Sequence, residues 1–138
     1  MDEEKKAKIL IIDDSPDFRE IVGRKLEMDG FAVVYAENGE DGIAALKNEK
    51  PDLTLLDVQM PKMDGSETIA RIHADPELQG AKVVFLTSLG EPQGVMARQD
   101  EQFARDVGAI GYIKKTEELG RIIRAVHGFL GIKQAGTQ

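Results

Sequence analysis

Three carboxylates follow short apolar runs in this chain. Asp13 and Asp14 come directly after residues 8–12, and Asp57 closes the run at residues 53–56. A carboxylate at the tip of a buried strand is costly unless a cation or a hydrogen-bond donor meets it. Taken alone, Asp57 could equally end its strand or cap the next turn, and the first two acids could simply begin a helix. If all three met at one crevice they would repel one another, which a hard divalent cation such as Mg2+ would relieve.

A hydroxyl and an ammonium group follow later apolar runs. Thr87 ends one such run, and Lys115 comes just after another. Each residue alone has a blander explanation, since a threonine often caps a strand and a lysine is usually solvated. At the same sheet edge as the three acids, however, they could receive a phosphoryl group. The combination favours a phosphoryl site with Mg2+ over five unrelated structural roles.

Five apolar runs have the length and composition of buried strands, and helical patterns alternate with them. Parallel strands need crossover connections, so this alternation predicts an α/β fold with a doubly wound parallel sheet. We expect the flavodoxin-like strand order 2-1-3-4-5 with five helices, whose switch point lies between the first and third strands. Ligands bind at that point, outside the carboxyl ends of the strands. The predicted strands are residues 8–12, 31–36, 53–57, 82–87 and 111–114.

Capping residues set the expected helix ends. Ser15 is predicted to cap the first helix, which Gly30 stops. Ser66 is predicted to cap the third helix and Thr116 the last one. A fourth helix is expected to end at Gly108.

Composition excludes several classes of protein. The 138 residues suit one domain, with 41% hydrophobic and 31% charged residues. A net charge of -7 argues against direct nucleic-acid binding, which needs a basic patch. The chain has no cysteine, so disulfides and thiolate metal sites are excluded. Neither a signal peptide nor a membrane-spanning run is expected, and a cytoplasmic location is the default expectation.

The motifs at the strand ends resemble those of the receiver (phosphoacceptor) domain of two-component response regulators, of the chemotaxis-regulator-like kind. The resemblance covers about residues 6–131 and leaves a polar tail at 132–138. Each motif alone is weak, but all four occur in order at the ends of the right strands. They are Asp13-Asp14, Asp57 with Met60-Pro61-Met63-Asp64-Gly65, Leu86-Thr87-Ser88, and Gly111-Tyr112 with Lys115.

The resemblance implies roles for the acids. In that family the residue matching Asp57 is phosphorylated by a sensor histidine kinase or a phosphotransfer protein. Asp14 and Asp57 would ligate Mg2+, and Asp13 would act largely through water. The backbone carbonyl of Gln59 would complete the protein ligands.

The resemblance also implies a switch. Thr87 and Lys115 would contact the phosphoryl oxygens, and family spacing favours Lys115 over Lys114. Tyr112 would turn inward as Thr87 moves, changing the face formed by the last two helices and the strand at 111–114. A downstream protein would bind that face, and a homodimer is possible. The domain would be a signalling switch and not an enzyme, apart from its own phosphoryl transfer and dephosphorylation.

The chain departs from the family pattern near the site. Thr116 stands where the family usually has proline after a cis bond, and we expect a trans bond here because cis costs much more before threonine. The segment from Thr87 to Tyr112 is a few residues longer than usual. Gln59 and Leu89 occupy the positions that flank the attacking water, so slow self-dephosphorylation is expected.

Three other functions fit the sequence less well. A magnesium phosphatase with an aspartate nucleophile needs a second acid two residues later, where this chain has Gln59. A flavin-binding module needs hydroxyl and glycine donors after the first strand, where Asp13, Asp14 and Asp17 would repel a phosphate. A degenerate receiver would have lost an acid or the lysine, and none is lost.

Overall fold

A five-stranded parallel sheet forms the centre of the protein, whose computed structural model describes residues 6–58, 65–87 and 108–131. Its order, β2-β1-β3-β4-β5, confirms the predicted flavodoxin-like fold. The predicted strands agree with the observed ones to within one residue. Their bounds are β1 (Lys8–Ile12), β2 (Ala32–Ala36), β3 (Leu53–Asp57), β4 (Val83–Thr87) and β5 (Gly111–Lys114).

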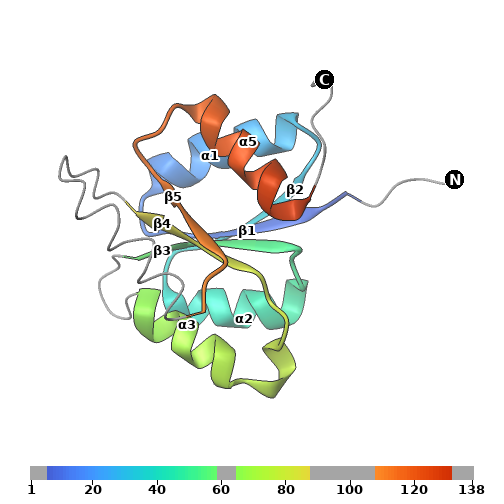
Figure 1. The fold of residues 1–138 in the computed structure, drawn as a ribbon, viewed down its shortest axis with the longest axis vertical. Coiled ribbons are helices and arrows are strands. Elements are labelled where there is room, and N and C mark those ends of the chain that lie inside the picture. The colour runs from blue at the N-terminus through green and yellow to red at the C-terminus, as the bar shows by residue number, and fades with distance from the viewer. Residues whose placement is uncertain (1–5, 59–64, 88–107, 132–138) are drawn as a thin grey trace, which may run out of the picture.

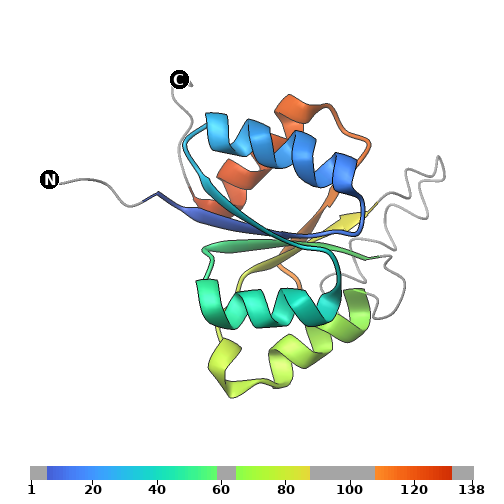
Figure 2. The ribbon, with the colours of Figure 1, turned by 180° about the vertical axis from the view of Figure 1, so that it is seen from behind.

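Helices cover both faces of the sheet. Figure 1 shows α1 (Pro16–Met28) and α5 (Leu119–Leu130) on one face, and α2 (Gly39–Glu49) and α3 (Gly65–Ala74) on the other. The view from behind in Figure 2 shows the same three layers. A short 3-10 helix, η1 (Pro76–Leu78), follows α3. The expected fourth helix lies outside the described residues, apart from its final Gly108.

Strand residues alternate between two hydrophobic cores. In β1, Ile9 and Ile11 pack beneath α1 and α5, whereas Leu10 and Ile12 face the α2 and α3 layer. The strands β3 and β4 alternate in the same way, and every residue of both is buried. Burial on both faces explains why these strands read as continuous apolar runs. The polar residues that end the strands are therefore held on a rigid base.

The start and end of α1 follow the sequence signals. The Ser15 side chain accepts a hydrogen bond from the Phe18 N–H, and Pro16 occupies the first helical position. After the helix, Gly30 adopts φ +100° and donates its N–H to the Glu27 carbonyl at 3.0 Å. This left-handed conformation favours glycine. The predicted boundaries of the first helix are confirmed.

Two predicted N-caps are wrong. Ser66 lies inside α3, which already begins at Gly65, because the Gly65 N–H donates to the Val58 carbonyl and turns the chain directly into the helix. Thr116 does not cap α5, because the N-cap of that helix is Glu118. The Glu117 N–H instead donates to the Lys114 carbonyl at 3.1 Å and closes a turn. That turn uses the residues that the sequence assigned to the helix start.

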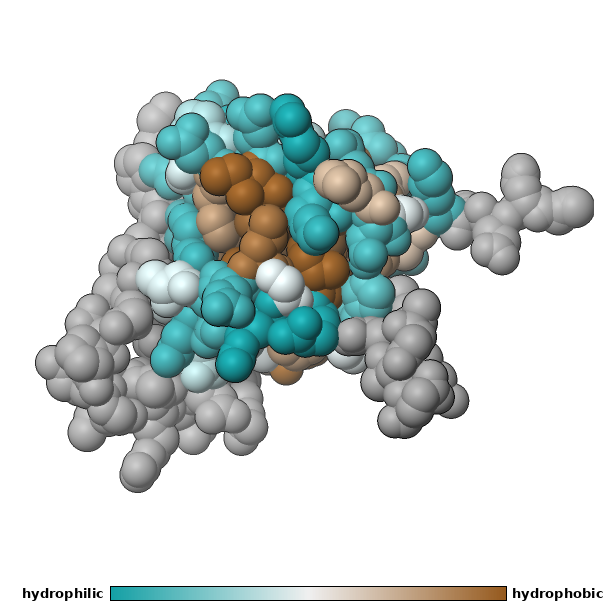
Figure 3. Space-filling view, turned by 90° about the horizontal axis from the view of Figure 1, so that it is seen from above, coloured by the Kyte–Doolittle hydropathy of each residue, from teal (hydrophilic) through white to brown (hydrophobic). Residues whose placement is uncertain are grey.

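An apolar patch interrupts the hydrophilic surface above α1 and α5 (Figure 3). On α1, Ile21 is 57% exposed and Met28 is 75% exposed. Exposed apolar area of this kind often marks a contact surface. Among the described residues, no helix is long and apolar enough to cross a membrane.

Candidate functional site

The three acids meet at the carboxyl edge of the sheet. Asp57 is the last residue of β3, and Asp13 follows β1 directly. The two strands are neighbours, with Ile12 opposite Leu56, so their ends deliver both side chains to one place. One carboxylate oxygen from each of Asp13, Asp14 and Asp57 lies within 4.8 Å of the other two.

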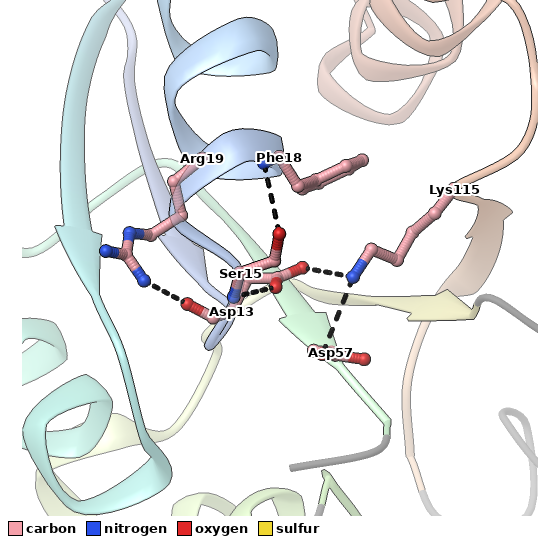
Figure 4. A network of polar contacts seen from close by, with 6 residues as sticks. All are labelled: Asp13, Ser15, Phe18, Arg19, Asp57 and Lys115. Atoms are coloured by element: carbon pink, nitrogen blue, oxygen red, sulfur yellow. Dashed lines mark hydrogen bonds and ion pairs between the residues drawn. The ribbon is translucent and has the colours of Figure 1, made fainter.

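Asp13 is fully buried, and several polar contacts hold it in place. Its Oδ1 accepts the Ser15 N–H at 2.8 Å, and its backbone carbonyl accepts a hydrogen bond from Arg19 Nη1 at 2.6 Å. Its Oδ2 has no hydrogen bond within the described residues and is compensated by the Lys115 ammonium at 2.8 Å. Figure 4 shows this network converging on Asp13 from α1 and from the loop after β5. A buried carboxylate is tolerated here because both of its oxygens are compensated.

Lys115 bridges two of the acids. Its Nζ lies 2.8 Å from Asp13 Oδ2 and 3.6 Å from Asp57 Oδ2, and its side chain is only 15% exposed. The backbone N–H of Lys115 donates to the Thr87 carbonyl at 2.8 Å, which anchors the loop beside β4. No cis peptide bond occurs among the described residues, so the Lys115–Thr116 bond is trans, as expected. The lysine therefore reaches the crevice without the family's cis geometry.

The charge and ligand type of the crevice fit a magnesium ion. Three carboxylates and one ammonium give the crevice a net negative charge. Mg2+ prefers hard oxygen ligands and usually keeps several waters while binding one or two carboxylates. Asp14 is exposed, whereas Asp13 and Asp57 are buried, so the crevice opens to solvent on the Asp14 side. The arrangement can hold a divalent cation that remains partly hydrated.

Two further predicted residues, Thr87 and Tyr112, lie at or near the same edge. Thr87 ends β4 and is buried, one strand away from Asp57. Tyr112 lies on β5, packs against the core beneath α2 and α3, and borders a surface cavity of about 380 Å³. Gln59 and Leu89 lie outside the described residues.

Sequence reasoning missed two supporting side chains from α1. Arg19 holds the Asp13 carbonyl, and the ring of Phe18 lies with its centroid 4.7 Å from Lys115 Nζ. Both residues belong to the first turns of the helix that follows Asp13 and Asp14. An aromatic and a basic residue at that position were available signals, but their sequence positions alone do not show that they approach Lys115 and Asp13.

Gly65 brings α3 against the end of β3 at a distance that no other residue permits. A Cβ at Gly65 would lie 2.8 Å from Val58 Cα and 2.9 Å from the Asp57 carbonyl oxygen. Both contacts are to backbone, so Gly65→Ala is expected to destabilise the protein by about 1–3 kcal/mol. Urea unfolding measures this change.

Gly128 in α5 is the matched control. A Cβ there meets nothing within 4 Å, so Gly128→Ala is expected to stabilise the protein by about 0.5–1 kcal/mol. Equal effects of the two substitutions would contradict the close approach at Gly65.

The chain matches a family model over most of its length. Residues 9–127 match the model described as response regulator receiver domain. Protein PilH of Pseudomonas aeruginosa is 31% identical over 124 residues, which cover 90% of this chain and 98% of PilH. The probable transcriptional regulator ycf27 of Guillardia theta is 35% identical over 129 residues, covering 91% of this chain. The match spans only 47% of that relative.

Solved structures show the same fold. The chemotaxis protein CheY4 of Vibrio cholerae superposes with a TM-score of 0.79 and 25% identity, covering 91% of this chain and 99% of CheY4. A receiver domain of NarL from Mycobacterium tuberculosis gives a TM-score of 0.75 at 27% identity, covering 94% and 100% of the two chains. The family model and the solved structures agree on the fold. The chain belongs to the receiver-domain family of two-component response regulators.

Proposed function

We propose that Asp57 accepts a phosphoryl group from a phosphohistidine in a Mg2+-dependent reaction. The family implies phosphorylation-regulated signalling, and receiver domains generally bind Mg2+ at an acidic pocket. The observation that carries the proposal for this chain is the position of Asp57. It is 3% exposed at the end of β3, within the acid cluster and 3.6 Å from the Lys115 ammonium.

We assign direct and water-mediated roles in binding Mg2+ to the three acids. Asp14 and Asp57 would be the direct carboxylate ligands, with the Gln59 carbonyl completing the set, and Asp13 would act largely through water. The contacts of Asp13 support this division, since its oxygens already serve the Ser15 N–H and the lysine ammonium. Bound Mg2+ would supply positive charge to the oxygens of the transferring group.

The transfer step is a direct displacement at phosphorus. A carboxylate oxygen of Asp57 forms the new O–P bond while the N–P bond of the donor breaks, and the freed histidine nitrogen takes a proton from water. The transition state spreads negative charge over three oxygens, and the ammonium of Lys115 offsets part of it. Thr87 offers its hydroxyl to the same oxygens from the end of β4.

Phosphorylation shifts the equilibrium between two arrangements of one fold. The site gains charge, because a phosphoryl group carries about -1.5 to -2 where the carboxylate carried -1. Thr87 moves toward that charge and vacates space, into which Tyr112 turns. The changed face comprises β5, α5 and the helix expected before Gly108. The position of Tyr112 supports this assignment, because its side chain borders a surface cavity at the β5 and α5 face together with Glu117 and Arg121.

Receiver domains interact with histidine kinases or phosphotransfer proteins and with downstream effectors. For this chain we propose a phosphodonor protein at the acidic edge and a protein target at the β5 and α5 face. We place the reaction in the cytoplasm, and a homodimer is compatible with it. Such a domain is a switch rather than a classical enzyme.

Acetyl phosphate tests the proposed function without the natural kinase. Incubation with acetyl phosphate and Mg2+ is expected to add the mass of one phosphoryl group, which intact-mass spectrometry detects. The same incubation with a chelator is expected to add none. A protein that remains unmodified with Mg2+ at high donor concentration would contradict the proposal.

Thr116→Pro is expected to slow this phosphorylation. Proline restricts the backbone of the preceding residue, and here that residue is Lys115, whose position in the crevice depends on the turn after β5. The control is Thr116→Ala, which should change stability by less than about 0.5 kcal/mol because Thr116 caps no helix. Unchanged phosphorylation of the proline variant would show that the turn does not set the lysine position.

A further inference from the structure

We propose that Phe18 is a positioning residue for Lys115. The aromatic ring of Phe18 keeps the lysine ammonium in the crevice while Mg2+ and the phosphoryl group act on the carboxylates that pair with it. This inference rests on the proposed function, because it concerns the lysine that faces the phosphoryl group. It assigns to α1 a direct part in the site, beyond the acids at the sheet edge.

Among the described residues, the ammonium of Lys115 has contacts with three side chains in the crevice. Two are carboxylates, Asp13 at 2.8 Å and Asp57 at 3.6 Å. The third is the face of Phe18, with 4.7 Å between Nζ and the ring centroid. This distance lies within the range of a cation–π interaction, which strengthens as the cation loses water. Because the lysine side chain is only 15% exposed, the interaction takes place in a largely desolvated setting.

The ring differs from the two carboxylates in what can compete for it. The phosphoryl group would form on Asp57, and water of the hydrated cation would approach Asp13, so both groups compete with Lys115 for the acids. A neutral ring binds neither group and keeps its attraction for the ammonium. The lysine stem is flexible, so the ring removes solvated positions that the ammonium would otherwise occupy. The contact with Phe18 is therefore the one for which neither group competes.

The backbone of Phe18 is well placed to hold the ring. Its N–H donates to Ser15 Oγ at 3.3 Å, and Ser15 in turn donates its own N–H to Asp13. The helix cap thus links the ring to the same carboxylate that pairs with the lysine. Figure 4 shows Phe18 of α1 and Lys115 of the loop after β5 meeting above Asp13 and Asp57.

A simpler role for Phe18 is packing, since it borders the core beneath α1 and α5. Phe18→Leu separates the two roles, because leucine keeps an apolar side chain but has no π face. Phe18→Tyr keeps the face and is the rescue variant. The phosphorylation rate constant with acetyl phosphate and Mg2+ is expected to fall about 2- to 30-fold in the leucine variant and to stay near the wild-type value in the tyrosine variant.

A double-mutant cycle with Lys115→Gln shows whether the ring acts through the lysine. If it does, Phe18→Leu should have no further effect on the rate constant once the ammonium is gone. The same fold-loss in both backgrounds would overturn the inference, and so would an unchanged rate constant in the Phe18→Leu variant alone.

Proton NMR provides a readout that does not depend on phosphorylation. The ε-methylene protons of Lys115, assigned by their loss in Lys115→Gln, should show an upfield ring-current shift that disappears in Phe18→Leu. The shift should remain when Mg2+ is added, because the ring contact does not compete with the ion. Loss of the shift with Mg2+ would overturn the inference. A wild-type protein that shows the shift but takes no phosphate would contradict the proposed function and leave the ring contact established.

Discussion

Asp57→Asn is expected to abolish phosphorylation by acetyl phosphate in the presence of Mg2+. The side chain at this position closes the central strand β3, is 3% exposed, and lies in the carboxylate cluster beside Lys115. An amide has nearly the same shape as a carboxylate, so the core beneath it is undisturbed. The amide lacks the anionic oxygen that attacks phosphorus, and therefore no phosphoryl adduct should appear in the intact mass.

Glu40→Gln is the matched control for this loss. It makes the same carboxylate-to-amide change on the exposed first turn of α2, and should leave the rate of phosphorylation unchanged. Equal labelling of wild type and Asp57→Asn would reject Asp57 as the acceptor. Labelling of Asp57→Asn at a slower rate would point instead to a second acceptor, which peptide mapping would locate.

Lys115→Ala is expected to lower the free energy of unfolding by about 3–5 kcal/mol when Mg2+ is absent. Removing one partner of a buried ion pair leaves the other charge uncompensated, which usually costs about this amount. Here the orphaned atom is Asp13 Oδ2, which is buried and has no hydrogen bond within the described residues. Urea unfolding in the presence of a chelator measures the loss.

Magnesium should restore much of that stability. A ligand that binds only the folded state stabilises it, and the ion has no ammonium to compete with in the alanine variant. The stabilisation by Mg2+ should therefore be larger in Lys115→Ala than in wild type. Lys114→Ala is the control, because Lys114 lies in β5 opposite Thr87 and contributes no ion pair to the acids. A larger loss in Lys114→Ala would place the functional lysine one residue earlier.

The sequence predicted the parts of the fold that repeat a simple pattern. The buried strands were recognisable because both of their faces are covered, which turns them into continuous apolar runs. The predicted parallel order by itself brings Asp13 and Asp57 to one edge of the sheet. Asn38 and Ser15, which accept hydrogen bonds from the first turns of α2 and α1, are capping residues of the expected type.

The sequence failed where distant contacts override a local signal. Ser66 and Thr116 are good capping residues, but the chain near each of them is fixed by hydrogen bonds to β3 and β5. The different environments of Asp13 and Asp14 were also not predictable, because adjacent acids look alike until the fold turns one inward and leaves the other exposed. The approach of Phe18 to Lys115 was not predictable either, because it depends on how α1 and the loop after β5 meet.

The ion pair between Lys115 and Asp13 has a consequence for synthesis of the chain on the ribosome. The acids at the ends of β1 and β3 are made well before the lysine that pairs with them, and a domain generally folds as a unit. A nascent chain that lacks the loop after β5 therefore carries these carboxylates without their ammonium partner. The ion pair can form only after that loop has left the exit tunnel. Until then, dissolved cations can take the place of the ammonium, so the ions around the ribosome bear on when the acidic edge of the sheet folds.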